Sequence, residues 1–482
     1  MRVRRVDQKS QASRGPARDR MRLRSPEEIH GRGGSRPDRN GRVPPHTRWL
    51  GYLLSAVAVA VGLAASGAES PALRAGVGRV DLTPPLEMKA ALGGYGARRS
   101  KPALGVHDAV WAKALVLAQG DRRFALLTAD VLAFPPRFKA AVMERLAGDG
   151  WGADQVLLLP SHSHTSIDMM ALHPGNVFSN AQAGIFHKEL YELTAQRLAN
   201  VIRAASQNLQ PALAGSVTVP LAGQNRNRRR GGSVHDPDLT VTRLDTVRGQ
   251  PLAVVANWTA HPTFMGHEDM LFSGDWPGHM QRTLEDLIGS GVTAMYYNGA
   301  EGDQSPMPPA VAASNWERAE RYGRRLGIAA WQAWTTIKPQ EPKKFAWHTE
   351  TIVLPKRQWH PDFMKTGGAE YGLNDQSVRV FIEQLVPAET SSTCLRLSDL
   401  VILGVPAELA AGLGMEAKAK ARELTGAGCV TIGGLANEWI SYALTPDEYR
   451  KGGYEASMSF YGETLGPTLV EGALRAAAGL GK

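Results

Sequence analysis

The sequence predicts an α/β fold in which a mixed β-sheet core, made of two packed sheets, is flanked by helices in a single large catalytic domain. Apolar, β-prone runs alternate along the chain with segments of helical periodicity. Two pairs of these runs are joined by short turns, at Gly120-Asp121 and at Arg248-Gly249-Gln250, which is typical of hairpins. Hairpins favour a mixed sheet over a purely parallel barrel. Because no repeat or linker divides residues 76–482, we expect one domain there.

The first 48 residues differ from the rest of the chain in charge. They hold 14 Lys and Arg against 5 Asp and Glu, and this difference of 9 equals the formal net charge of the 482-residue chain. The segment is rich in Arg, Gly, Pro and Ser, so we expect a disordered basic leader. The remainder is neutral overall, which argues against a nucleic-acid partner for the folded part.

An uncharged apolar run at 49–65 follows the leader and is followed by the small residues Ser66-Gly67-Ala68. A basic flank, an apolar stretch and a small-residue cleavage site within 49–68 are typical of a secretory signal, so we expect an exported protein, periplasmic or secreted. The alternative is an uncleaved signal that anchors the chain in the membrane. Because the leader is long for a signal, Met21 is an alternative start to Met1.

The first half of the globular part is predicted element by element. Residues 76–83 form a strand that Pro84-Pro85 stop, and 111–119 with 123–130 form the first hairpin. Residues 135–146 have helical periodicity, and 155–160 form a short apolar strand. Residues 185–207 form an amphipathic helix, because their apolar side chains recur at helical spacing. A strand at 211–220 precedes a polar, basic loop at 223–232.

The second half continues the same alternation. Residues 239–244 and 251–258 form the second hairpin, and 274–288 with 316–337 are helical, separated by 294–298 and a turn at 299–306. A strand at 345–354 is followed by a strand pair within 395–405, a helix at 409–424 and a last strand at 430–435. A polar, tyrosine-rich segment at 437–462 leads to a terminal helix.

Only two cysteines occur, Cys394 and Cys429. In an exported protein they either form a disulfide or remain two buried thiols, and the sequence leaves both open. Neither has the spacing of a metal ligand. A metal in this protein would therefore be bound by His, carboxylate or phenol groups.

Residues able to bind a metal recur where the predicted strands end. His162 and His164 follow the strand 155–160, and on an extended segment their side chains share a face. His261 follows 251–258, Glu408 follows 395–405 at the start of the predicted helix, and Tyr442 lies in the loop beyond 430–435. Two imidazoles and a carboxylate are the ligands of a catalytic zinc that keeps one position open. The alternatives are structural: core histidines, a turn cap at His261 and a carboxylate at a helix N-terminus.

Ordered sequence blocks carry a resemblance to a known family. They are Gly105-Val106-His107, Ser161-His162-Ser163-His164, Asn225-Arg226-Asn227-Arg228, Ala260-His261-Pro262, Asn298 to Pro306, Pro406-Ala407-Glu408, and Ser441-Tyr442 through Glu448-Tyr449 to Tyr454-Glu455. In these blocks the chain resembles the neutral/alkaline non-lysosomal ceramidases, in their N-terminal catalytic domain only. Two departures stand out. Thr165 to Met170 replace the small, glycine-rich loop usual in the family, and its further C-terminal β domain has no counterpart before the end of the sequence.

The resemblance implies a Zn2+-dependent amidase that hydrolyses an N-acyl amide bond. Its zinc ligands would be His162, His261, Glu408 and Tyr442. The resemblance further implies that His164 shuttles a proton or stabilises the oxyanion, that Arg228 and Tyr454 hold polar groups of the substrate, and that Ser305 is a neighbouring hydrogen-bonding residue. The expected partner is a small N-acyl or lipid-like molecule, through which the protein would meet a membrane surface; the oligomeric state is left open.

Three other interpretations compete with this one. The same residues suit a zinc hydrolase of another N-acyl compound or of an ester. Ser305 with His164 or His261 would suit a serine hydrolase, although the nucleophile elbow Gly-x-Ser-x-Gly is absent. A non-catalytic exported binding protein is the third. The sequence also leaves open whether Trp258, Phe264, Met169 and Met170 line an acyl pocket or belong to the core, and we expect core packing. Arg229 and Arg230 are expected in a solvated loop.

Overall fold

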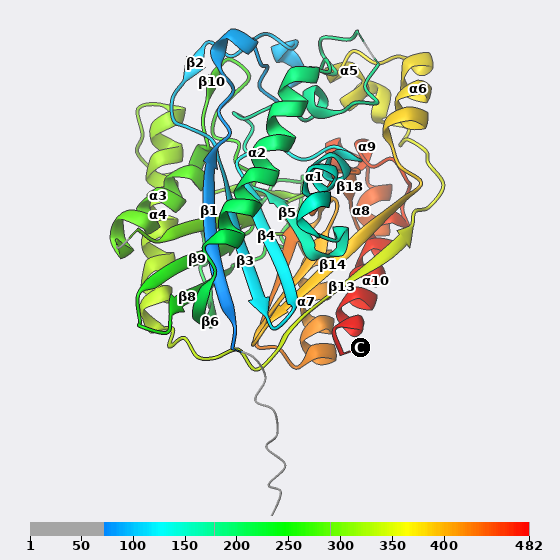
Figure 1. Cartoon of the computed structure of the whole chain (residues 1–482). Helices are drawn as coiled ribbons and strands as arrows, with labels where there is room; N and C mark the ends of the chain where they lie inside the picture. Colours follow the sequence, from blue (N-terminus) through cyan, green and yellow to red (C-terminus); the bar gives the residue numbers. More distant parts are fainter. Residues whose placement is uncertain (1–71, 178, 290, 482) are drawn as a thin grey trace, which may run out of the picture. The chain divides into compact units, whose positions relative to one another are not determined.

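The largest element of the computed structural model is an eight-stranded sheet (Figure 1). The structure describes residues 72–177, 179–289 and 291–481, so the predicted leader and signal segment lie outside the described residues. The strands of this sheet, in spatial order, are β11 (Thr293–Asn298), β9 (Pro251–Trp258), β8 (Asp238–Thr246), β6 (Gln210–Pro220), β1 (Arg74–Asp81), β3 (Trp111–Gln119), β4 (Arg122–Ala129) and β5 (Val156–Pro160). Only the outer pairs, β9 with β11 and β4 with β5, are parallel. Both predicted hairpins, β3–β4 and β8–β9, are confirmed.

A second sheet packs against the first. It contains β13 (Phe345–Val353), β14 (Glu389–Leu397), β15 (Leu400–Val405) and β17 (Cys429–Gly434). Leu395 and Ile402 of this sheet share a buried cluster with Leu157 of β5 and Met295 of β11. Alternate residues of the same strands, such as Leu158, face the opposite cluster under the helices. Strands buried on both faces read as continuous apolar runs. The predicted mixed core of two packed sheets is confirmed.

The large sheet curls so that its two edges approach each other. β1 and β6 pair at only two positions, Arg74 with Pro211 and Ala75 with Gln210. The two halves of the sheet are therefore joined only at one end of these strands. The edge strand β11 then contacts β4 and β5, which lie at the far end of the strand order, and it also contacts β17 of the second sheet. Loops that follow β5, β11 and β17 are thereby brought to one region.

Helices cover the outer faces of both sheets (Figure 1). α1 (Phe138–Leu146) and α2 (Lys188–Gln207) cover β1 and β3, and α3 (Asp275–Ile288) with α4 (Asn315–Thr336) cover the β8–β9–β11 end. α7 (Ala411–Thr425) and α10 (Leu465–Ala478) cover the second sheet. All described residues belong to one compact unit. Within the described ranges, none of the helices combines the length and the apolar character needed to span a membrane.

Several segments differ from the prediction. The helix expected at 409–424 begins at Ala411, because Glu408–Leu409 form a short strand, β16, that pairs in parallel with β18 (Tyr442–Ala443). The sequence predicts no element in 355–388, but this segment holds α5 (Gly367–Glu370) and the amphipathic α6 (Asp375–Leu385). The loop 223–232 contains β7 (Asn225–Asn227), which pairs with β12 (Gln304–Pro306). The remaining short elements are β2 (Gly105–Val106), β10 (Leu271–Phe272), α8 (Pro446–Arg450) and α9 (Tyr454–Ser457). Cys394 and Cys429 are buried free thiols.

Candidate active site

Four of the residues predicted from strand ends and from the family resemblance come together in one place. His162 follows β5 and His261 follows β9, while Glu408 lies on β16 opposite Tyr442 of β18. The Nε2 atom of His261 is 3.0 Å from Oε2 of Glu408, and the Nε2 atom of His162 is 3.5 Å from the same oxygen. All four side chains are nearly buried. The strand-end argument therefore identified residues that do converge.

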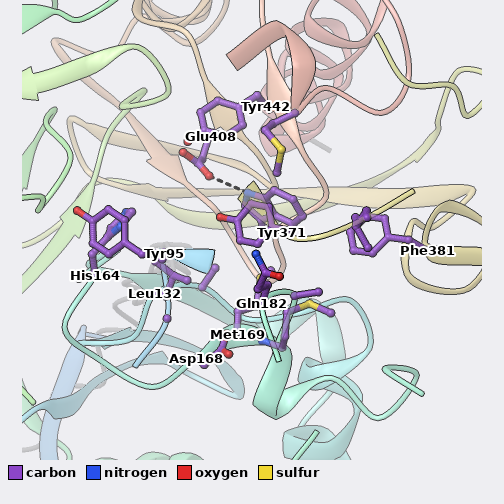
Figure 2. Close-up of a pocket in the computed structure, with 18 of the residues that line it drawn as sticks. Tyr95, Leu132, His164, Asp168, Met169, Gln182, Tyr371, Phe381, Glu408 and Tyr442 are labelled. Atoms are coloured by element: carbon purple, nitrogen blue, oxygen red, sulfur yellow. Dashed lines mark hydrogen bonds between the residues drawn. The ribbon is translucent and has the colours of Figure 1, made fainter. Parts of the chain in front are cut away.

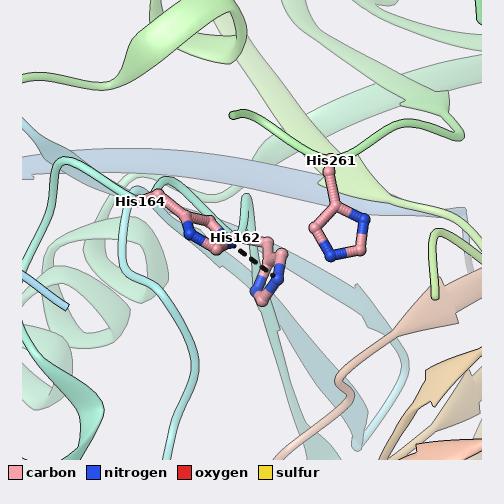
Figure 3. Close-up of side chains that lie close together, drawn as sticks. All are labelled: His162, His164 and His261. Atoms are coloured by element: carbon pink, nitrogen blue, oxygen red, sulfur yellow. Dashed lines mark hydrogen bonds between the residues drawn. The ribbon is translucent and has the colours of Figure 1, made fainter. Parts of the chain in front are cut away.

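The backbone at His162 differs from the expected extended segment. β5 ends at Pro160, and His162 has φ +67°, a left-handed conformation that is uncommon outside glycine. His162 and His164 nevertheless reach the same site from their two positions, with ring centroids 4.9 Å apart in a T-shaped arrangement (Figure 3). The two rings share a site because of this turn and not because of strand alternation. Strained backbone of this kind concentrates at functional sites.

Backbone carbonyls fix the orientation of the two imidazoles proposed as ligands. The Nδ1 atom of His162 lies 2.7 Å from the carbonyl oxygen of Leu132, and Nδ1 of His261 lies 2.8 Å from that of Glu301. Carbonyl oxygens only accept hydrogen bonds, so each Nδ1 carries a proton and donates it. The Nε2 atoms are thus the ones directed at Glu408. This arrangement is typical of histidines that bind a metal through Nε2.

The charges around Glu408 fit a cation between these groups. Burial and the charge of Arg228 lower the pKa of His261 to about 4, so this ring is neutral near pH 7. Burial alone would raise the pKa of Glu408, but His162 and His261 hold it well below its usual range, so it is ionised. Because Nδ1 of His261 already carries a proton, the 3.0 Å contact between its Nε2 and Oε2 of Glu408 needs a second proton or a metal cation between the two atoms. Two imidazoles and a carboxylate are a suitable donor set for zinc.

His164 lies beside this cluster and has fewer partners. Its Nε2 atom is 3.3 Å from Nε2 of His162, whereas its buried Nδ1 atom has no hydrogen-bond partner among the described residues. Burial lowers the pKa of His164 well below its usual value, and the neighbouring histidines lower it further. The backbone of Gly94 lies close to this ring, and a Cβ at that position would be only 2.3 Å from Nδ1. The Arg98 guanidinium donates a hydrogen bond to the backbone carbonyl of His164.

The phenol of Tyr442 links the cluster to Arg228. Arg228 donates from Nη2 to the hydroxyl of Tyr442 at 3.1 Å and from Nε to Glu455 at 2.8 Å. Burial and the charge of Glu408 raise the pKa of Tyr442 well above its usual value, so this phenol is protonated unless a cation binds beside it. The ring of Tyr454 packs edge-on against Tyr442, with centroids 6.0 Å apart.

Ser305 is the predicted site residue that does not join the others. It lies on β12 opposite Arg226 of β7 and does not line either cavity of the site. In residues 72–177, 179–289 and 291–481, no histidine side chain forms a hydrogen bond with it. A serine nucleophile activated by histidine has no geometric support here.

Sequence reasoning missed Glu301. Its side chain lies with those of His162 and Glu408 in a group whose ligand atoms are all within 4.8 Å of one another. Burial and the charge of Glu408 raise the pKa of Glu301 well above its usual value. The signal was available, because Glu301 follows the apolar run 294–298 as the other candidates follow their strands. It was counted only as part of the block from Asn298 to Pro306.

Two cavities meet beside the cluster, at His164 and Tyr442. The first, which we call the apolar chamber, has a volume of about 930 Å³ including its open mouth, and Leu132, Met169, Met170, Phe381 and Phe460 are among its walls. Figure 2 shows Glu408 and Tyr442 on one side of it and Asp168 and Met169 on the other, with Phe381 far from His164. Thus Met169 and Met170 do line a cavity, whereas Trp258 and Phe264 belong to the core beside α3 and α4.

The second cavity, the arginine chamber, is lined by many charged residues and has a volume of about 1590 Å³ including its open mouth. Arg228, Arg229 and Arg230 line it together with the loop around Gly452. Arg229 is not the solvated residue that was expected, because it bonds Glu455 and two backbone carbonyls. Arg230 is exposed and forms no ion pair within the described part of the chain. The two chambers share Gly94, Tyr95, His164, Tyr442 and Tyr454.

Comparison with known proteins agrees with this geometry. Residues 73–312 match the family described as neutral/alkaline non-lysosomal ceramidase, N-terminal. The neutral ceramidase of Pseudomonas aeruginosa is 22% identical over 493 residues, covering 85% of this chain and 72% of that protein. The neutral ceramidase of Drosophila melanogaster is 29% identical over 237 residues, which cover 45% of this chain and 33% of that protein.

Solved structures show the same fold. The crystal structure of neutral ceramidase from Pseudomonas aeruginosa superposes with a TM-score of 0.74 at 19% identity, covering 86% of this chain and 75% of that one. A structure described as ceramidase complexed with C2 gives 0.73 at the same identity. Through residues 73–312 and the fold that carries them, the chain belongs to the neutral/alkaline non-lysosomal ceramidase family.

Proposed function

We propose that this protein is a zinc-dependent hydrolase that cleaves the amide bond of an N-acyl lipid such as ceramide, giving a fatty acid and an amine. The observation that carries the proposal is the convergence of His162, His261 and Glu408. They lie beside His164 and Tyr442, which line both an apolar and a polar chamber. The relatives described as neutral ceramidases support the amide substrate. The apolar chamber suits an aliphatic chain, and a substrate that extends into both chambers would have its amide group beside the cluster.

His162, His261, Glu408 and Tyr442 would hold the zinc ion. When bound, zinc supplies a Lewis acid that activates water and polarises the carbonyl of the amide. His164 then has the role of moving a proton at Nε2, the ring atom that faces the cluster, to the leaving amine. Arg228, kept in place by Glu455, donates hydrogen bonds toward the developing oxyanion, and Tyr454 contacts the substrate at the chamber junction.

A second candidate substrate is favoured by the arginine chamber. The walls of this chamber carry four cations, Arg228, Arg229, Arg230 and Lys451, and three carboxylates, Glu370, Glu448 and Glu455, so cations are in excess by one. Arg230 has no acidic partner within the described residues. An N-acyl amine that carries a carboxylate or phosphate would be held there. This alternative keeps the same zinc chemistry and changes only the amine half of the substrate.

The test compares ceramide with an N-acyl glycine of the same acyl chain, and release of fatty acid is measured by mass spectrometry. Removal of metal by a chelator is expected to abolish release from either compound, and added zinc to restore it. A serine hydrolase would keep its activity after chelation. Arg230→Glu is expected to lower turnover of the N-acyl glycine at least tenfold and that of ceramide less. Arg226→Glu, an exposed arginine that lines neither chamber, is the matched control.

We also propose that the protein is exported, on the basis of the sequence at 49–68. Export brings the enzyme to lipids presented at a membrane surface, which it reaches through its substrate. N-terminal sequencing of the protein from expressing cells tests this proposal. A mature N-terminus close to residue 68 supports a cleaved signal, and an intact segment in the membrane fraction supports a signal anchor.

A further inference from the structure

Glu301 occupies a position that ties it to the candidate metal cluster through its own backbone. It lies in the turn between β11 and β12 and is 0% exposed. Its backbone carbonyl accepts the 2.8 Å hydrogen bond from Nδ1 of His261. The neighbouring Gly302 donates its backbone N–H to the carbonyl of Leu409, which directly follows Glu408. The turn that carries Glu301 is therefore fixed against two of the proposed ligand segments.

The side chain of Glu301 has no partner that explains its burial. Both carboxylate oxygens are enclosed, and neither forms a hydrogen bond with any described residue. It forms no ion pair within residues 72–177, 179–289 and 291–481, and the charged group that acts on it most strongly is another carboxylate, Glu408. Burial of a carboxyl group without partners costs several kcal/mol. Buried polar groups of this kind need an ion, a water molecule or another ligand.

A glycine, Gly434, leaves space for the side chain of Glu301. At Gly434, the last residue of β17, a Cβ would lie 2.5 Å from Oε2 of Glu301 and 2.2 Å from the carbonyl oxygen of Gly299. Any other residue at 434 would displace the carboxylate. On its other side Glu301 faces the cluster, where one of its carboxylate oxygens lies within 4.8 Å of a ligand atom of His162 and of Glu408.

We propose that Glu301 is a further ligand of the metal, so that two carboxylates, Glu301 and Glu408, face the ion beside His162 and His261. This inference rests on the proposed zinc-dependent function and extends its ligand set, which the family resemblance gave without Glu301. Two carboxylates balance the charge of a divalent cation in a buried site. Oxygen ligands also favour ions such as Mn2+ and Co2+ more than an all-imidazole set does.

A nearby carboxylate provides a matched contrast. Asp303 is as buried as Glu301, but its oxygens accept hydrogen bonds from the backbone of Ala411, from Gln304 and from Asn227. Asp303 is thus satisfied by the protein alone. If burial of an acid near the turn were the only relevant property, removing the charge of Glu301 or of Asp303 would have the same effect on zinc binding. If Glu301 is a metal ligand, only its replacement should weaken zinc binding.

The experiment measures metal binding directly. Metal-free wild type, Glu301→Gln and Asp303→Asn are titrated with Zn2+ by calorimetry, and Co2+-loaded samples are compared by their visible absorption bands, which report coordination. Loss of a ligand in Glu301→Gln is expected to raise the Kd for Zn2+ at least tenfold and to change the Co2+ bands. Asp303→Asn is expected to melt at a lower temperature and to bind Zn2+ within about twofold of wild type.

The outcomes separate the inference from the proposed function. Wild type that binds no zinc overturns the proposed function, and the inference with it. Wild-type binding together with unchanged Kd and unchanged Co2+ bands in Glu301→Gln overturns the inference alone. Glu301→Asp keeps the charge and withdraws it by one methylene group, so it is expected to give an intermediate Kd. Melting of each metal-free variant shows that it is folded before titration.

Discussion

Gly94→Ala should inactivate the enzyme without removing its metal. Gly94 has φ +90°, and a Cβ there would lie 2.3 Å from Nδ1 and 2.7 Å from Cγ of His164. An ordinary contact with that ring needs about 3.4 Å, so the imidazole must shift by about 1 Å. Misplacement of a catalytic group by 1 Å costs on the order of 10²-fold in rate, which corresponds to about 2.7 kcal/mol of transition-state stabilisation.

The control separates this contact from the backbone strain that Ala also introduces. Gly249, in the β8–β9 turn, has φ +79° and nothing within 4 Å of its Cβ position. Gly249→Ala therefore has a similar left-handed strain, of order 1 kcal/mol, away from the site. Both variants should lose a few degrees in Tm. Only Gly94→Ala should lose turnover.

The assay measures kcat for fatty-acid release at saturating substrate, with zinc content determined on the same samples. If Gly94 acts through His164, the double variant Gly94→Ala/His164→Ala should be no slower than His164→Ala alone, because the two changes damage one group. Wild-type kcat in Gly94→Ala would refute the reasoning. Loss of zinc in that variant would show instead that His164 is a ligand, contrary to the proposed division of roles.

Two further predictions follow from the site. His162→Ala, His261→Ala or Glu408→Ala should lower both zinc content and turnover, whereas His164→Ala should keep zinc and lose turnover; equal zinc loss in all four would contradict the assignment. Burial raises the pKa of Asp168, in the wall of the apolar chamber, from 3.8 to about 6. A raised carboxyl pKa stabilises the fold fully below about pH 4, and this contribution is lost as the pH rises through 6, by at most about 3 kcal/mol. Asp168→Asn should therefore gain in Tm over wild type between pH 4 and 8, and a constant difference over that range would count against this account.

The sequence predicted the strand ends because their signal is local. The apolar runs before His162, His261 and Glu408 are compositionally clear, and the rule that sites form at strand ends needs no tertiary information. The same rule placed Tyr442 in the loop beyond the strand 430–435, and the family resemblance made it a ligand. Glu301 also follows a predicted apolar run, 294–298, so its position obeys the same rule.

The chambers were beyond local reasoning for a physical reason. The apolar chamber is built from segments as distant as Gly93, Met170 and Phe381, and only tertiary packing brings them together. The helix α6, which supplies Phe381, was missed because its short apolar stripe stands in a polar region. The left-handed backbone at His162 was unpredictable too, because local propensity favours an extended residue there.

Three unfavourable local features of this protein lie together at the candidate metal site. His162 is held in a left-handed conformation, Glu301 is buried without a partner, and the lone pair of His261 faces the Glu408 carboxylate. Away from the site, the buried charge of Lys418 is paired directly with Asp236. At the candidate site the three unfavourable features are neighbours, so one ligand could relieve them together. A single bound cation would relieve the defects at Glu301 and Glu408 together and would offset the strain at His162, which is the physical reason for regarding the cluster as a metal site.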